Sequence, residues 1–270
     1  MGTEIQLSKG ALDRIRELIY GVAGITLGHD KDSMIRARLA GRLRALHVSS
    51  YESYLERVSR DRDELSQLVD LLTTNKTSFF REMQHFEFIA SELIPHWQRR
   101  GREVRIWSAA CSTGEEPYSV ALMMRTLMPG LPARILATDI SKRVLTAARS
   151  ARFARSLETS IPAEYRHYLT RVRDDDSRFE FKDEVRKMVS FARLNLMEDW
   201  PMRGPFDLIL CRNVMIYFDP ETRASLARRF AECLSDDGTL FIGHTESLHN
   251  LDQPLCRLRP AIYAHEPFDD

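Results

Sequence analysis

Apolar residues in the first 75 positions recur at the three- and four-residue spacing of amphipathic helices. Ser8 suits the N-cap of the first of four predicted helices, and Ser49 with Glu52 forms a capping-box pattern before the third. The stripes of the first, second and fourth helices are Leu12, Ile15, Leu18, Ile19 and Val22; Ile35, Leu39, Leu43 and Leu46; and Leu65, Leu68, Val69 and Leu72. Alternating β-branched runs do not occur in this part of the chain, so we predict a helical N-terminal domain over residues 1–75.

After a helical pattern that ends near Trp97, short apolar runs alternate with helical patterns. The runs cover residues 104–110, 134–139, 189–196, 206–211 and 239–243, and the helices cover 115–128, 141–149 and 221–234. Strands that are apolar on both faces and separated by helices are typical of a parallel sheet with helices on each side. We therefore predict an α/β fold with a doubly wound, mostly parallel sheet over residues 76–270. The closing run LCRLRPAIYAHE indicates a final antiparallel strand or hairpin.

Residues 151–188 do not fit this alternation, because they are charged and contain Phe179 and Phe181 in alternation with polar positions. A long structureless loop is unusual inside a compact domain. We interpret the stretch as an inserted subdomain with a helix and a small antiparallel sheet. A solvated surface excursion is the alternative that composition leaves open.

Composition narrows the class of protein. Among 270 residues, 39 are basic and 39 are acidic, and a neutral chain argues against a general nucleic-acid or membrane-surface binder. The four cysteines form no C-x-x-C pair, and no secretory signal or long apolar run is present. We expect a soluble, cytoplasmic protein without direct membrane insertion.

The loop after the first predicted strand, AACSTGEEP at residues 109–117, lies where a doubly wound sheet binds its ligand. Gly114 is its only glycine, and Glu115 and Glu116 would repel a pyrophosphate at the helix N-terminus. A cationic or zwitterionic adenosine compound fits this loop better than a dinucleotide does. Alternatively, the two acids only stabilise the helix N-terminus.

Polar residues also end the other predicted strands. Asp139 ends the second strand, where an acidic residue usually binds ribose hydroxyls, although it also suits helix capping. Asn195, Arg212 and Asn213 follow two later strands and are either binding residues or turn formers. Because four successive strand ends point to one edge, an adenosine site is the better interpretation.

Other candidate chemistry is sparse. Hydrolase, zincin and Walker A motifs are absent, and the eight histidines show no ligand spacing, so we expect no metal. Phe79 and Phe80 are typical of a core, although the segment 75–81 around them could also close over a ligand between domains.

The second predicted helix is locally basic. Residues 31–46 contain five basic residues and one acid, and Arg38 and Arg42 share a face. Such a run is either a solvated face or a docking site for an acidic partner. The docking candidates are Arg36, Arg38, Arg42 and Arg44.

Several long blocks of the chain resemble one known family. TNKTSFFRE, RIWSAACSTGEEPYS, LATDIS, GPFDLILCRNVMIYFD and LSDDGTLFIGHTES are similar to the CheR-type chemotaxis receptor glutamate methyltransferases, over about residues 10–265. The resemblance implies a class I methyltransferase-like fold and transfer of a methyl group from S-adenosylmethionine to receptor glutamates. The products would be glutamate methyl esters and S-adenosylhomocysteine. The partners would be the cytoplasmic helices of methyl-accepting receptors, which are acidic and would suit the basic helix.

The resemblance also implies site residues. By motif, the cofactor-binding residues are Asn75, Thr77, Arg81, Glu116, Asp139, Asn195, Leu196, Arg212 and Asn213, and the catalytic residues are Arg81 and Tyr217. We expect Asp139 to hold the ribose, Glu116 to accept from a cofactor donor, and Asn195 and Leu196 to border the adenine. Arg81 and Tyr217 would orient the cofactor carboxylate or the incoming glutamate.

One departure from the family and two other functions bear on this interpretation. In some relatives a glycine-containing loop of the inserted subdomain captures a receptor C-terminal pentapeptide, but TRVRDDDSRFEF lacks glycine, so we do not expect that tether.

A non-catalytic cofactor-binding adaptor and a small-molecule O-methyltransferase are the alternative functions. We expect a monomer, and the sequence leaves a regulatory protein partner open.

Overall fold

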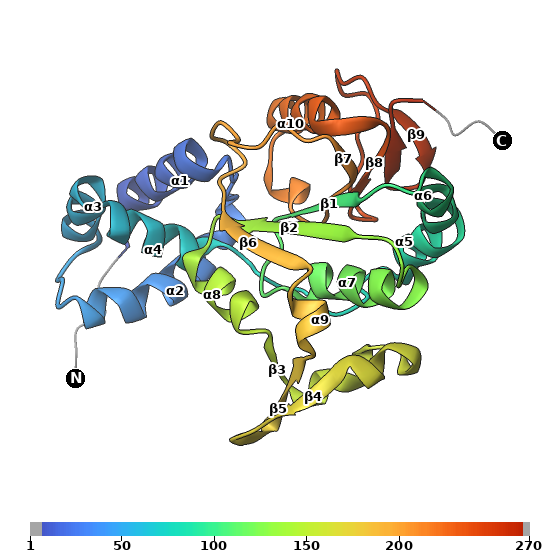
Figure 1. Cartoon of the computed structure of the whole chain (residues 1–270). Helices are drawn as coiled ribbons and strands as arrows, with labels where there is room; N and C mark the ends of the chain where they lie inside the picture. Colours follow the sequence, from blue (N-terminus) through green and yellow to red (C-terminus); the bar gives the residue numbers. More distant parts are fainter. Residues whose placement is uncertain (1–6, 267–270) are drawn as a thin grey trace.

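The N-terminal helices follow the predicted pattern. The computed structural model describes residues 7–266; the predicted domain limits 1–75 and 76–270 also include six N-terminal and four C-terminal residues outside the described residues. The helices are α1 (Lys9–Ala23), α2 (Asp32–Ala45), α3 (Tyr51–Arg60) and α4 (Arg62–Leu72), with a 3₁₀ turn, η1 (His29–Lys31), before α2. Ser8 caps α1 as predicted, and Gly24 ends it with a φ of +68°. These helices form the blue-to-cyan layer in Figure 1.

The predicted cap of the third helix is wrong by one residue. Ser50, rather than Ser49, accepts a 3.1 Å hydrogen bond from the Ser53 amide and caps α3. Glu52 does not complete a capping box, because its carboxylate accepts a 2.8 Å hydrogen bond from the Ser8 hydroxyl. Glu52 therefore ties α3 to the start of α1.

A seven-stranded sheet forms the centre of the molecule. The strand order is β6-β2-β1-β7-β8-β10-β9. The first five of these are parallel, and β10 and β9 add an antiparallel hairpin at the edge. Their bounds are β1 (Val104–Ala109), β2 (Ala133–Asp139), β6 (Val189–Arg193), β7 (Phe206–Cys211), β8 (Leu234–Ile242), β9 (Cys256–Arg259) and β10 (Ile262–Ala264). The predicted doubly wound, mostly parallel sheet is confirmed.

Helices cover both faces of this sheet. Figure 1 shows α7 (Glu115–Leu127) and α8 (Lys142–Ser150) on one side and α10 (Pro220–Cys233) on the other. Strand β1 serves both cores, because Ile106 belongs to the cluster under α7 and Trp107 to the cluster under α10. The apolar stripes of α1–α4 join the α10 cluster. The α7 cluster instead includes α5 (Met83–Phe88), the π-helical turn η2 (Ile89–Leu93) and α6 (Ile94–Arg100).

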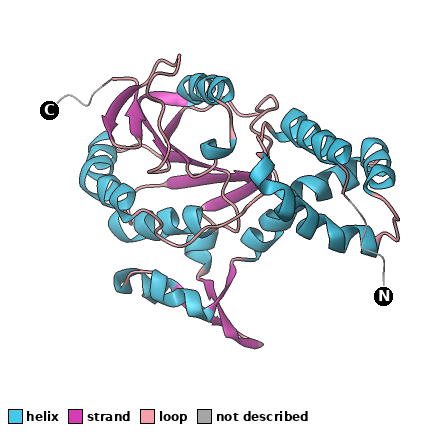
Figure 2. Ribbon diagram, turned by 180° about the vertical axis from the view of Figure 1, so that it is seen from behind, coloured by secondary structure: helices cyan, strands magenta, loops and turns pink. Residues whose placement is uncertain are grey.

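The inserted stretch forms a second sheet, as predicted. This sheet has the order β3-β5-β4 and is antiparallel, and Figures 1 and 2 show it projecting from the main body. Its strands are β3 (Arg152–Ala154), β4 (Leu169–Val172) and β5 (Asp175–Phe181). The stretch contains one short α-helix, α9 (Asp183–Arg186), and two 3₁₀ segments, η3 (Arg155–Ser160) and η4 (Ala163–Tyr168).

Aromatic rings join the insertion to the rest of the chain. Phe79 lies 4.9 Å from Phe153 and 5.7 Å from Phe181, measured between ring centroids, and Tyr118 of α7 lies 4.8 Å from Phe181. Phe79 and Phe80 are buried, as their adjacency predicted. Within residues 7–266, no helix has both the length and the apolar character needed to cross a membrane.

Candidate active site

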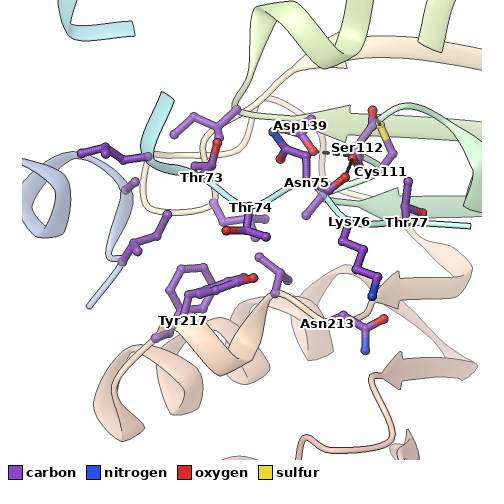
Figure 3. Close-up of a pocket in the computed structure, with 18 of the residues that line it drawn as sticks. Thr73, Thr74, Asn75, Lys76, Thr77, Cys111, Ser112, Asp139, Asn213 and Tyr217 are labelled. Atoms are coloured by element: carbon purple, nitrogen blue, oxygen red, sulfur yellow. Dashed lines mark hydrogen bonds between the residues drawn. The ribbon is translucent and has the colours of Figure 1, made fainter. Parts of the chain in front are cut away.

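A cleft opens at the carboxyl ends of β6, β2, β1 and β7, where the N-terminal helices meet the sheet. It contains about 1210 Å³ of free space, counting its open mouth. Figure 3 shows Asp139 and Ser112 on one side, Tyr217 and Asn213 on the other, and the segment from Thr73 to Thr77 between them. All the cofactor and catalytic residues implied by the resemblance line this cleft: Asn75, Thr77, Arg81, Glu116, Asp139, Asn195, Leu196, Arg212, Asn213 and Tyr217.

The loop after β1 lines the cleft with Ala110, Cys111 and Ser112. Ala110, Ser112 and Gly114 all have positive φ, at +63°, +50° and +98°. A Cβ at position 114 would lie 3.0 Å from the Cβ of Ala148, so the close packing of the loop against α8 requires glycine. The Ser112 amide donates a 2.9 Å hydrogen bond to Asp139, which joins the first two strand ends.

Asp139 is a buried acceptor facing the cleft. Its other oxygen accepts a 2.9 Å hydrogen bond from the Ser141 amide. Burial raises the pKa of Asp139, while the amides of Ser141 and Ser112 oppose that rise. Because a carboxylate offers about four lone-pair sites, Asp139 keeps acceptor capacity for ribose hydroxyls.

Arg212 is the centre of a buried ionic network. Its guanidinium lies 3.0 Å from Glu116 and 3.0 Å from Glu82, and its side chain is 1% exposed. Glu116 also accepts a 2.7 Å hydrogen bond from the Ser108 hydroxyl. Burial raises the pKa of Glu116 despite the Arg212 charge. Glu116 therefore anchors Arg212, a role that the sequence interpretation did not include.

Glu82 is a site residue that the sequence interpretation missed, although it lies in the TNKTSFFRE block. Its carboxylate accepts a 2.9 Å hydrogen bond from the Asn213 side chain and pairs with Arg212. Burial favours the neutral acid, but the Asn213 and Arg212 donors outweigh it and lower the pKa of Glu82. Glu82 thus holds the two residues that follow β7.

The wall near β6 is mainly apolar. Leu196, Leu194 and Ile140 line it together with Asn195. The side-chain nitrogen of Asn195 donates a 2.7 Å hydrogen bond to the Val22 carbonyl, and the side-chain oxygen of Asn195 accepts a hydrogen bond from the main-chain amide of Met197. Because those hydrogen bonds occupy the Asn195 side chain, Leu196 supplies the surface against which a flat base can pack.

The segment 73–81 crosses the cleft between the helical layer and the sheet. Arg81 donates a 2.9 Å hydrogen bond to the Lys76 carbonyl, and Ser112 donates a 3.1 Å hydrogen bond to the Asn75 carbonyl. The Asn75 side-chain nitrogen and Arg212 Nε are buried and lack a hydrogen-bond partner among the described residues. Asn75, Arg212 and Asp139 make this part of the cleft lining polar.

The four predicted docking arginines differ in their exposure to solvent. Arg36 and Arg44 are exposed, whereas Arg38 and Arg42 are half-buried. Arg42 forms a bidentate pair with Glu64, whose side chain is 2% exposed. Arg38 donates hydrogen bonds to the carbonyls of Leu71 and Thr73. Arg38 and Arg42 share a face, as predicted, but that face packs on α4 and its C-terminal end, so the expectation that they belong to an exposed docking surface is corrected.

The histidines that looked scattered in sequence are not all scattered in space. Glu82, His85 and His244 place ligand-type atoms within 4.8 Å of one another. However, Asn213 and Arg212 already engage the Glu82 carboxylate, and the Arg212 cation opposes a second cation beside it. We assign no metal to this cluster.

The fold and the cleft define the class of protein as a class I methyltransferase-like α/β domain preceded by an all-α domain. Two family models match the chain, the "CheR methyltransferase, all-alpha domain" over residues 10–73 and the "CheR methyltransferase, SAM binding domain" over residues 75–260. The chain therefore belongs to the CheR methyltransferase family and is an S-adenosylmethionine-dependent methyltransferase.

Curated relatives match along most of the chain. The chemotaxis protein methyltransferase of Borreliella burgdorferi is 37% identical, covering 96% of this chain and 95% of the relative. The probable chemotaxis protein methyltransferase of Rhizobium etli is 41% identical, covering 85% and 89%, respectively. The chemotaxis protein methyltransferase of Salmonella typhimurium is 39% identical, covering 98% and 93%. These matches confirm the resemblance drawn from the motifs.

Proposed function

We propose that this protein transfers the methyl group of S-adenosylmethionine to glutamate side chains on the cytoplasmic helices of chemotaxis receptors. The products would be glutamate methyl esters and S-adenosylhomocysteine. The observation that carries the proposal is the convergence of ten motif residues on one cleft in a chain of the CheR family. The chemotaxis names of the relatives support receptors as substrates.

The proposed methyl transfer requires little acid–base catalysis by the protein. A glutamate carboxylate is ionised at neutral pH, so it needs no general base. When bound, the cofactor supplies an electrophilic methyl group on a sulfonium centre. What remains for the protein is to position both partners and exclude water.

Each wall of the cleft has a role in this proposal. Asp139 accepts hydrogen bonds from the ribose hydroxyls, and Leu196 packs against the adenine. Asn75 and Arg212 line the part of the cleft that would take the amino acid end of the cofactor, and Glu116 keeps Arg212 in place. Arg81 and Tyr217 orient the cofactor carboxylate or the incoming glutamate, with Thr77 and Asn213 beside them.

The N-terminal helices contribute to substrate docking in this proposal. Ala23, Ile25, Thr26, Leu27, Lys31 and Met34 belong to that layer and line the cleft. Exposed Arg36 and Arg44 lie on α2 and would meet an acidic receptor helix.

Two measurements test the function. Calorimetry should show binding of S-adenosylmethionine and S-adenosylhomocysteine, and receptor membranes should acquire label from the methyl-labelled cofactor. Because carboxyl methyl esters hydrolyse in base, the label should leave as volatile methanol at alkaline pH. Binding without transfer would favour an adaptor, transfer only to small acids would favour a small-molecule enzyme, and no binding of either compound would overturn the proposal.

A further inference from the structure

A buried carboxylate accepts hydrogen bonds from the segment that follows β7. Glu246 lies in the turn after β8 and is 7% exposed. One of its oxygens accepts hydrogen bonds from the main-chain amides of Asn213, at 3.0 Å, and Gly243. The other oxygen accepts a 3.1 Å hydrogen bond from the Ile216 amide.

The segment that Glu246 contacts, residues 212–217, has residues of the candidate site at both ends. Arg212 and Asn213 begin it, and the 3₁₀ turn η5 (Met215–Tyr217) ends it. Asn213 has a φ of +59°, a left-handed conformation that asparagine adopts more readily than most other non-glycine residues. Its side chain is held by Glu82 while its amide is held by Glu246, so two carboxylates fix one residue from opposite ends.

Gly243 shows how closely the two loops approach. A Cβ at this position would lie 2.4 Å from the Asn213 side-chain nitrogen and 2.9 Å from the Asn213 amide. Glycine is therefore required where the turn after β8 meets the segment after β7. The close approach is what lets a single carboxylate reach amides on both loops.

We propose that Glu246 is a positioning residue, whose carboxylate fixes the backbone of residues 213–216 and so places the Asn213 and Tyr217 side chains in the cleft. This inference rests on the proposed roles of Asn213 and Tyr217. Glu246 itself does not line the cleft. The negative charge matters because a carboxylate can accept from three amides at once, whereas a carboxamide presents one acceptor oxygen and a competing donor.

The test compares Glu246→Gln with the wild-type chain and with Glu232→Gln, a matched change at an exposed position on α10. Hydrogen–deuterium exchange of peptides covering residues 212–217 should become about tenfold faster in Glu246→Gln, while β1 peptides stay protected. The turnover at saturating cofactor should fall by about tenfold or more, because misplacement of a reacting group lowers kcat. Glu232→Gln should match the wild type.

A purely structural role would lower the melting temperature without local changes in exchange or in kcat below that temperature, and this result would overturn the inference. If Glu246→Gln does not fold, Gly243→Ala tests the same clamp, because its Cβ would lie 2.9 Å from both the Asn213 amide and the Glu246 carboxylate and would push the two apart. The exchange measurement needs no receptor. A wild-type chain without receptor methylation would therefore contradict the proposed function, while exchange would still decide the role of Glu246.

Discussion

The Arg38 guanidinium on α2 donates a 2.9 Å hydrogen bond to the main-chain carbonyl of Thr73, a residue that lines the cleft. The basic helix and the cofactor site are thus joined by a direct contact. A change at Arg38 therefore affects more than the surface charge of α2.

We predict that Arg38→Gln weakens the binding of S-adenosylhomocysteine about 3- to 10-fold, which corresponds to about 0.7 to 1.4 kcal/mol. The reason is that the carbonyls of Leu71 and Thr73 lose a charged donor, so the segment leading to Asn75 becomes less ordered. Calorimetry measures the effect, and Arg36→Gln at an exposed position of the same helix is the control. Equal affinities for the two variants would contradict the prediction.

Receptor docking is better tested at Arg36 and Arg44 than at Arg38 and Arg42. Reversing Arg42 would place a second carboxylate against buried Glu64 and destabilise the helical layer. We predict that Arg36→Glu with Arg44→Glu lowers receptor methylation several-fold at low salt and leaves cofactor affinity unchanged. Added salt should shrink the difference, because it screens exposed charges.

A charge-matched control for this pair is Arg257→Glu with Arg259→Glu, since both side chains are exposed on the edge strand β9. That variant should methylate receptors at the wild-type rate. If the α2 variant also kept the wild-type rate at low salt, α2 would not be the docking surface.

Arg81 and Tyr217 are predicted to act on turnover. Both line the cleft, and the Thr26 amide donates a 2.8 Å hydrogen bond to the Tyr217 carbonyl. Arg81→Ala and Tyr217→Phe should each lower kcat about tenfold or more because they remove groups that orient the reactants. Thermal unfolding should stay close to that of the wild type, and full turnover in both variants would show the assignment to be wrong.

His85 should make the protein less stable in acid. Its ring is 1% exposed, and burial, followed by the charges of Arg212 and His244, lowers the pKa of His85 to about 3, with Glu82 acting in the opposite direction. Between its unfolded pKa of 6.5 and that value, the unfolded chain binds the extra proton. The free energy of unfolding should therefore fall by roughly 1.4 kcal/mol per pH unit from this group as the pH decreases.

Urea unfolding at about pH 7.5 and about pH 5 measures this dependence. His85→Leu should show a smaller loss of stability between the two pH values, whereas His249→Leu, at an exposed position, should behave like the wild type. The same loss in all three proteins would exclude His85 as its source.

The sequence predicted the elements whose signal is local. Ser8 and the apolar spacing define α1 without help from distant residues, and the doubly apolar strand runs define the sheet. The carboxyl ends of parallel strands necessarily share an edge, so Asp139, Asn195 and Arg212 were correctly expected to lie together. The cleft therefore followed from topology.

The sequence could not predict contacts between distant residues. Ser49 and Ser50 are equally good caps in isolation. The Glu52 carboxylate does not complete a capping box, because it accepts a hydrogen bond from Ser8, 44 positions earlier. Arg42 looked like a surface charge because its partner Glu64 lies on another helix. Glu82 and Glu246 lie in two of the quoted motif blocks, but a buried acid that holds other groups looks the same in sequence as an exposed one, so their roles were missed.

The aromatic contacts of Phe79 determine which residues must be exchanged together in a chimera of this protein and a relative. Phe79 belongs to the segment 73–81 that crosses the cleft, and it packs on Phe153 and Phe181 of the inserted sheet. A chimera that swaps only residues 151–188 would pair a foreign sheet with the native Phe79 and Tyr118. The exchangeable module is therefore discontinuous in sequence, and a graft should carry positions 79 and 118 along with the insertion.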